Sequence, residues 1–186
     1  PNTHLTRGML GLERARCESG DDVSAPTRRI SWLKEAVREG LAAGEPNGRI
    51  LACRAELDLA LQLRDLGDCT AAADHARRVE EHWDDLPPDI AAACGAEARL
   101  VLGMALLDSG DEAGALKALR EAVERGRHAV LPDARHYAAV AAWHLHAALL
   151  GDRKIAEAGL ALAALEELVP GLAAEQRPLF VALMAY

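Results

Sequence analysis

The chain has 186 residues, of which 51% are apolar and 27% are charged, and its net charge is −8. Its aromatic residues are three Trp, two Tyr and one Phe, while Ala and Leu are abundant, so the composition favours closely packed helices over a sheet sandwich. The acidic balance and the shortage of aromatic stacking platforms argue against direct binding of nucleic acid.

Four helical hairpins are predicted, because segments with apolar residues at helical spacing alternate with Gly, Pro and Asp punctuation. The first helices of the hairpins are expected near residues 3–19, 47–66, 89–109 and 133–150. The second helices are expected near residues 27–43, 69–85, 112–128 and 153–168. A ninth helix is expected over residues 172–186. The units run over about 1–45, 46–87, 88–130 and 131–169, and together they are expected to form one all-α repeat domain over residues 1–186.

The dipeptide Gly-Asp marks the expected turn of each hairpin. It begins at Gly20, Gly67, Gly110 and Gly151, so successive pairs are 47, 43 and 41 residues apart. Gly is suited to the left-handed conformation that ends a helix, and Asp is suited to cap the N-terminus of the next helix. We therefore expect all four pairs to be tight turns between antiparallel helices.

Residues 96–122, AEARLVLGMALLDSGDEAGALKALREA, resemble a tetratricopeptide (TPR) repeat. The matching positions are Leu102, Gly103, Leu106, Gly110, Ala115, Leu119 and Ala122, while Arg99 stands where the family has an aromatic residue. The equivalents around the second turn are Leu59, Ala60, Leu63, Ala72, Ala76 and Val79. Around Gly151 they are Trp143, Ala147, Ala156, Leu160 and Ala163.

The resemblance implies a right-handed α-α superhelix that acts as a non-catalytic scaffold and binds a protein or peptide segment. Long-period arrays of this kind are similar to the helical arms of bacterial multidomain regulators. Because the sequence begins at Pro1 without a Met, we expect it to be part of a larger protein. The alternative function is a regulatory domain that closes on a small molecule or short peptide. An enclosed cavity would favour the small ligand, and a shallow open groove would favour the protein segment.

In the family, the first helices line a concave groove, and the resemblance implies which side chains point into it. These are Arg7, Arg14, Arg54, Leu57, Leu61, Arg64, Glu97, Leu100, Met104, Leu107 and Leu145. The arginines of this set suit an acidic partner with apolar anchors. The competing interpretation is that the leucines pack between neighbouring units and that the arginines pair with carboxylates on the same helices, namely Glu13, Glu18, Asp58 and Asp65.

No motif for a hydrolase, dinucleotide, P-loop or zinc-protease site occurs, so no catalytic residue, cofactor or metal ligand is predicted. His144 and His146 are two residues apart, a spacing that places them on different faces of a helix. Cys17, Cys53 and the two other cysteines lack the dense spacing of a disulfide framework, which favours a cytoplasmic location. No apolar run approaches the roughly 20 residues of a membrane span.

The predicted ninth helix carries apolar residues around almost its whole circumference. We expect Leu179, Phe180 and Leu183 to pack back on the preceding helix. The outward-facing residues are then Val181, Met184 and Tyr186. This surface predicts either further chain in the parent protein or a homodimer formed through the C-terminal helix.

Overall fold

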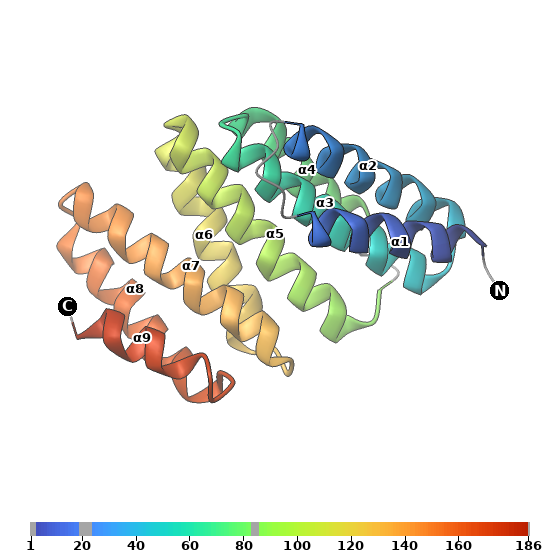
Figure 1. The fold of residues 1–186 in the computed structure, drawn as a ribbon. Helices are drawn as coiled ribbons and strands as arrows, with labels where there is room; N and C mark the ends of the chain where they lie inside the picture. The colour runs from blue at the N-terminus through green and yellow to red at the C-terminus, as the bar shows by residue number, and fades with distance from the viewer. Residues whose placement is uncertain (1–2, 19–23, 83–85, 186) are drawn as a thin grey trace. The chain divides into compact units, whose positions relative to one another are not determined.

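The computed structural model describes residues 3–18, 24–82 and 86–185 (Figure 1). These residues form helices and turns without any β-strand, so the all-α prediction is confirmed for them. The chain divides into two compact units, Pro1–Pro87 and Pro88–Tyr186. The division falls at the boundary predicted between the second and third hairpins, and each unit is described by itself below.

The first unit contains α1 (Thr3–Cys17), α2 (Ala25–Ala43), α3 (Pro46–Asp65) and α4 (Cys69–Arg78), followed by a 3-10 turn, Val79–His82. Each helix packs against the next one in the chain, and α1 also contacts α3. The helices α2 and α3 approach closely where two glycines meet, since a Cβ on Gly40 would lie 2.7 Å from the carbonyl oxygen of Gly48. Fully buried Leu33, Leu59 and Val79 belong to its core.

The second unit contains α5 (Pro88–Ser109), α6 (Glu112–Arg127), α7 (Pro132–Gly151) and α8 (Ile155–Leu168). A 3-10 turn, Val169–Gly171, and the short helix α9 (Arg177–Met184) complete it. Consecutive helices from α5 to α8 pack together, and α5 also packs on α7. The helix α9 contributes the buried Phe180 to the core, and the ring centre of Phe180 lies 5.8 Å from that of His136 in an edge-on arrangement.

The turns at Gly67 and Gly110 have the predicted conformation, with φ of +83° and +85°. Asp68 and Asp111 follow them as N-caps, and each side chain accepts a hydrogen bond from the backbone N–H three residues further on, at 3.1 and 3.0 Å. In both turns the aspartate N–H also bonds to a carbonyl five residues back, at 2.9 Å. The first predicted pair, at Gly20, lies outside the described residues.

The fourth pair does not form the predicted turn. Gly151 is still part of α7, and the left-handed residue is Arg153, with φ of +57°. The backbone bond from Lys154 N to Leu149 O, at 2.9 Å, reproduces the bond that follows Gly67 and Gly110. Lys154 therefore occupies the N-cap position, and its side chain makes no capping hydrogen bond.

Core packing accounts for this shift of two residues. Counted from Arg153, the small residue at the helix crossing is Ala158, which is fully buried, whereas the predicted Ala156 is exposed. The same count places Leu145 in register with Leu59, and both are buried. A turn at Gly151 would instead have brought the bulkier Trp143 to that position, where α7 and α8 meet.

The last helix is shorter than predicted, since it begins at Arg177 and has Pro178 in its first turn. Phe180 is buried, and Leu183 and Met184 pack partly against the core. The expectation that Leu179 packs inward is wrong, as is the expectation that Met184 points outward, because a helix of about two turns buries only residues spaced by three or four.

Candidate binding surface of the first unit

The contact between α1 and α3 carries two neighbouring hollows along one line of side chains, which we call the α1–α3 seam. On α1 the seam includes residues 5, 9, 12 and 16, and on α3 it includes residues 47, 51, 54, 58, 62 and 65. Both sets have steps of three or four residues, so each forms a single stripe on its helix. The seam is thus built from the helical periodicity of two segments that are distant in sequence.

The first hollow is mainly apolar and has a volume of about 390 Å³. It is lined by Leu5, Met9, Leu12, Glu13, Asn47, Ile50, Leu51 and Arg54. Leu12 and Leu51 are buried in its floor, whereas Met9 is 55% exposed. Methionine is flexible and polarisable, and it adapts to differently shaped apolar groups. Glu13 and Arg54 place one charge of each sign beside the apolar lining.

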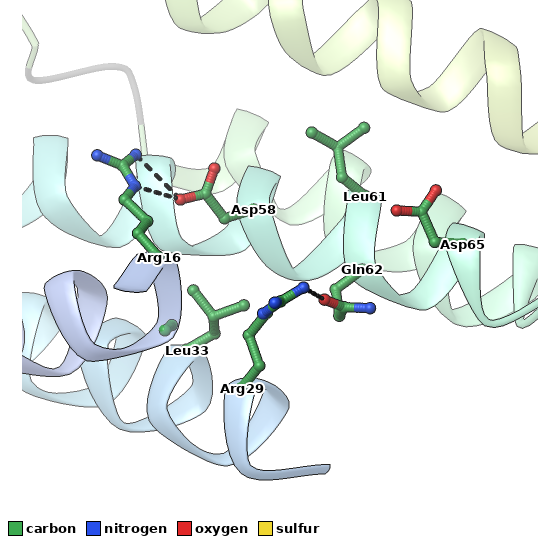
Figure 2. A pocket seen from close by; sticks show the side chains of 8 residues that line it. Arg16, Arg29, Leu33, Asp58, Leu61, Gln62 and Asp65 are labelled. Carbon is green, nitrogen blue, oxygen red and sulfur yellow. Dashed lines mark hydrogen bonds and ion pairs between the residues drawn. The ribbon is translucent and has the colours of Figure 1, made fainter. Parts of the chain in front are cut away.

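The second hollow has a volume of about 320 Å³ and lies at the C-terminal ends of α1 and α3 (Figure 2). We call it the polar hollow because five polar or charged residues line it together with Ala15, Leu33 and Leu61. Arg16 and Asp58 form an ion pair across it at 3.0 Å. Arg29 of α2 donates a 2.6 Å hydrogen bond to the side-chain carbonyl of Gln62. The Nε of Arg29 is buried and has no hydrogen-bond partner among the described residues.

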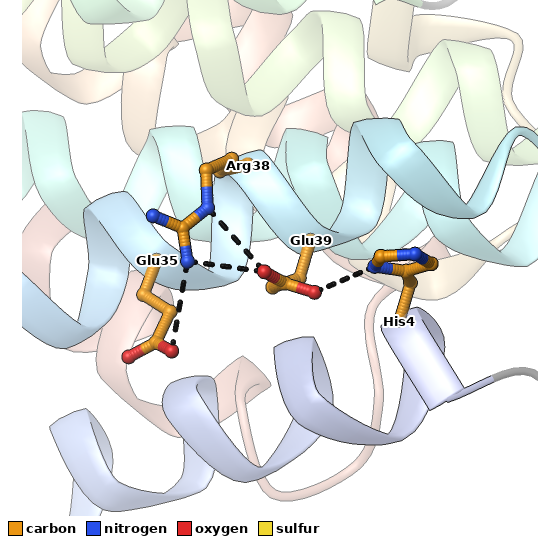
Figure 3. Close-up of polar contacts among 4 residues, drawn as sticks. All are labelled: His4, Glu35, Arg38 and Glu39. Atoms are coloured by element: carbon orange, nitrogen blue, oxygen red, sulfur yellow. Dashed lines mark hydrogen bonds and ion pairs between the residues drawn. The ribbon is translucent and has the colours of Figure 1, made fainter.

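A group of polar contacts holds α1 on α2 in the same unit (Figure 3). The buried carboxylate of Glu39 accepts hydrogen bonds from Nδ1 of His4 at 2.8 Å and from Nη2 of Arg38 at 3.0 Å. Arg38 also lies 3.8 Å from Glu35. The hydrogen bond from His4, and then that from Arg38, lowers the pKa of Glu39. These contacts fix the N-terminal half of α1, which supplies Leu5 and Met9 to the apolar hollow.

The predicted groove residues of the first unit differ in their exposure to solvent. Arg7 and Arg14 are exposed, Arg54 lines the apolar hollow, and Leu61 lines the polar hollow. Arg64 is half-buried. The prediction that Leu57 faces the groove is wrong, because α3 packs on α1, α2 and α4 and this side chain is fully buried.

The predicted groove residues of the second unit are mostly core residues. Leu100 and Leu145 belong to the cluster formed by α5 to α9, and Glu97 is also buried. Met104 and Leu107 pack partly against the same cluster. The interpretation that the leucines are packing residues is therefore correct for Leu100 and Leu145. A groove that continues from one unit to the other stays a prediction.

Two of the carboxylates expected to pair with the predicted arginines have other partners. Asp58 binds Arg16, and Glu18 binds Arg28 at 2.7 Å. In the part of the chain that the structure describes, Arg7 and Arg14 have no carboxylate within ion-pair distance. The sequence interpretation missed Met9 and Arg16, although their spacing with Leu5 and Leu12 on one stripe of α1 could have indicated them.

At the C-terminus, the predicted self-association residues have different surroundings. Val181 is 53% exposed, Met184 is half-buried, and Tyr186 lies outside the described residues. Self-association through this helix stays a prediction.

Among the residues that the structure describes, no group of three His, Cys, Asp or Glu side chains is arranged to hold a metal ion. The four cysteines are not joined in disulfides. Contrary to the expectation from the sequence, the helix α5 is long and apolar enough by composition to cross a membrane, and half of its most apolar stretch is buried in the protein.

No protein-family model matches the chain, and no curated protein matches it. The resemblance to TPR repeats therefore rests on the residues of the repeats themselves.

Proposed function

We propose that the chain is a non-catalytic helical-repeat module of the TPR-like type, part of a larger regulatory protein, that binds a protein segment along the α1–α3 seam. The observation that supports this proposal is the apolar hollow lined by Leu5, Met9 and Ile50, in which the side chain of Met9 is exposed. Buried apolar surface contributes about 25 cal/mol per Å², so two or three apolar anchors in this hollow would supply much of the affinity.

The charge that would contact an acidic residue of the segment is Arg54, which lines the hollow. Arg7 and Arg14 are exposed, but each stands two residues beyond Leu5 or Leu12, a step of about 200° around α1, so they lie on the opposite face of the helix. Glu13 is the one acidic side chain in the lining. An amphipathic helix with acidic residues beside its apolar face complements this arrangement.

The open form of the hollow favours a protein segment over an enclosed small molecule. Met9 and Glu13 line the hollow and are exposed, so the lining is accessible from the surface. A small regulatory ligand would instead be expected to have most of its surface enclosed. The superhelical arrangement of the two units, the cytoplasmic location and the C-terminal homodimer belong to the same proposal.

The test is a selection of peptides on the purified chain, followed by affinity measurements on variants. We expect selected peptides to combine two or three apolar residues with several Asp or Glu residues. Met9→Glu should weaken their binding by at least about tenfold, since a charge would enter the apolar hollow. Arg54→Glu should slow association and reduce its dependence on salt.

The matched control is Leu160→Glu, which places the same charge at a side chain of the second unit that is 73% exposed. This variant should bind the selected peptides as the parent does. Peptides that bind Met9→Glu as tightly as the parent, or that contain no acidic residues, would contradict the proposed surface.

A further inference from the structure

A third hollow of the first unit lies between α2 and α4, above α3, and is separate from the α1–α3 seam. It has a volume of about 330 Å³ and is lined by Lys34, Val37, Glu56, Leu59, His75 and Arg78. The helix α3 packs on both α2 and α4. Two second helices of neighbouring hairpins thus form the walls of the hollow, and one first helix forms its floor.

The floor contains a buried carboxylate that is hydrogen bonded to a histidine. Glu56 is only 3% exposed, and its carboxylate is hydrogen bonded to Nδ1 of His75. A buried carboxylate is costly unless a cationic or donating partner satisfies it. The pair therefore places a carboxylate in the core with a hydrogen-bond donor beside it.

Among the three hairpins whose turns the structure describes, this pair occurs in one. Counted from the left-handed turn residue, the positions of Glu56 and His75 are occupied by Arg99 and Ala118 in the third hairpin. In the fourth hairpin they are occupied by Ala142 and Ala161. General packing of the repeat therefore does not require a carboxylate and an imidazole at these positions.

Two cations lie at the walls of the hollow. Lys34 extends from α2 and Arg78 from α4, and both are exposed. The guanidinium Nη1 of Arg78 is 3.5 Å from Nδ1 of His75, which places it next to the buried pair. Across the described ranges, neither Lys34 nor Arg78 has a carboxylate within ion-pair distance.

Nearby carboxylates are already engaged with other arginines. Asp74 pairs with Arg77 at 3.0 Å, and Glu35 lies 3.8 Å from Arg38. Neither carboxylate is part of the lining of the hollow.

The second unit has a corresponding hollow whose walls carry a different set of charges. It lies between α6 and α8, and its lining includes Leu145 and Leu149 of α7. There, Arg120 of α6 is paired with Glu157 of α8 at 2.7 Å. In the second unit a carboxylate of the protein thus bridges the two walls, whereas in the first unit both walls present cations.

We propose that the α2–α4 hollow binds a phosphate group, with Lys34 and Arg78 as its charged ligands. The carboxylate of Glu56 is already hydrogen bonded to His75, so Lys34 and Arg78 are the groups of the lining that can bind an anion. A dianionic phosphate matches two converging cations better than a single carboxylate does. The group is either free inorganic phosphate or a phosphorylated side chain of a partner, and the chemistry of recognition is the same for both.

The experiment is a titration of the isotopically labelled chain followed by amide NMR spectra at constant ionic strength. One arm uses inorganic phosphate, and the other uses a phosphoserine peptide together with its unphosphorylated form. We expect saturable shifts at residues around the hollow. Lys34→Gln and Arg78→Gln should each raise the dissociation constant for phosphate by at least about tenfold. Both side chains are exposed, so the variants should keep the melting temperature of the parent.

The matched control is Lys117→Gln, which removes one charge from an exposed site on α6. It should leave the titration unchanged. Binding of the phosphopeptide but not of free phosphate would support the site and assign it to a phosphorylated partner, and the reverse would assign it to the free ion. Absence of saturable shifts up to about 10 mM in both arms, or an equal loss in the Lys117→Gln control, would overturn the proposal.

Discussion

Replacing Arg153 with Gly is expected to relieve backbone strain in the turn between α7 and α8, although it also removes a charged side chain. Arg153 is the described non-glycine residue with positive φ, and it occupies the position that Gly67 and Gly110 occupy in the other turns. A residue with a Cβ pays about 1–2 kcal/mol in the left-handed conformation. Glycine avoids this cost and loses about 0.5–1 kcal/mol through the greater freedom of the unfolded chain.

The difference leaves a net backbone gain of about 0.5–1 kcal/mol for glycine. The positive charge of Arg153 also interacts favourably with the C-terminal end of α7, an effect of about 0.3–1 kcal/mol that any neutral substitution removes. The proper reference is therefore Arg153→Ala, which removes the charge and keeps the Cβ. We expect the Arg153→Gly variant to be more stable than the Arg153→Ala variant by about 0.5–1 kcal/mol.

Urea unfolding followed by circular dichroism would measure this difference. The reciprocal change, Gly110→Ala, lies in the same unit and should destabilise the chain by a similar amount. A Gly variant at residue 153 that is no more stable than the Ala variant would show that the turn does not hold residue 153 in the left-handed conformation.

Three further predictions concern packing and pH. Gly103→Ala should destabilise the second unit, because the added Cβ would lie 2.7 Å from Cγ of the buried Leu119, and thermal melting of the variant against the parent would measure the loss. Burial lowers the pKa of His136 below 6.5 despite the opposing charge of Asp133. The unfolded state therefore binds more protons than the folded state, and the free energy of unfolding should fall as the pH drops through about 6.5. A His136→Gln variant should lack this part of the dependence of stability on pH. The pKa of Glu39 in the folded state is lowered below 4.5, so the ionised carboxylate stabilises the fold above that pH. This stabilisation is lost as the pH falls through the pKa of the folded state. In an acid titration, the stability of the Glu39→Gln variant should therefore fall less steeply than that of the parent.

The hairpins and two of the turns could be predicted from sequence because their signals are local. Gly67-Asp68 and Gly110-Asp111 combine a residue that tolerates positive φ with one that caps a helix, and both functions act within a few residues. The pair at Gly151 has the same local chemistry but does not form the turn. The position of the turn between α7 and α8 is decided by the burial of Leu145 and Ala158, which depends on how these two helices pack.

The candidate surface was harder to predict for the same reason. Arg54 and Leu61 line the hollows, and their place on an outward stripe of a first helix could be expected from the helical spacing. Leu57 lies on the same helix, but its burial depends on three neighbouring helices that no local pattern specifies. Arg29 comes from α2, whose contribution to a surface of first helices follows only from the tertiary packing.

The boundary between the two units falls between Pro87 and Pro88. A proline lacks the backbone N–H that propagates a helix, and it disfavours the helical conformation of the residue before it. Helical order that begins in α5 therefore cannot spread backwards through Pro88, so each unit must nucleate its own helices. We expect the amide protons of the two units to exchange with solvent as two cooperative blocks, and we expect the first unit to pair its helices during synthesis before the second is complete.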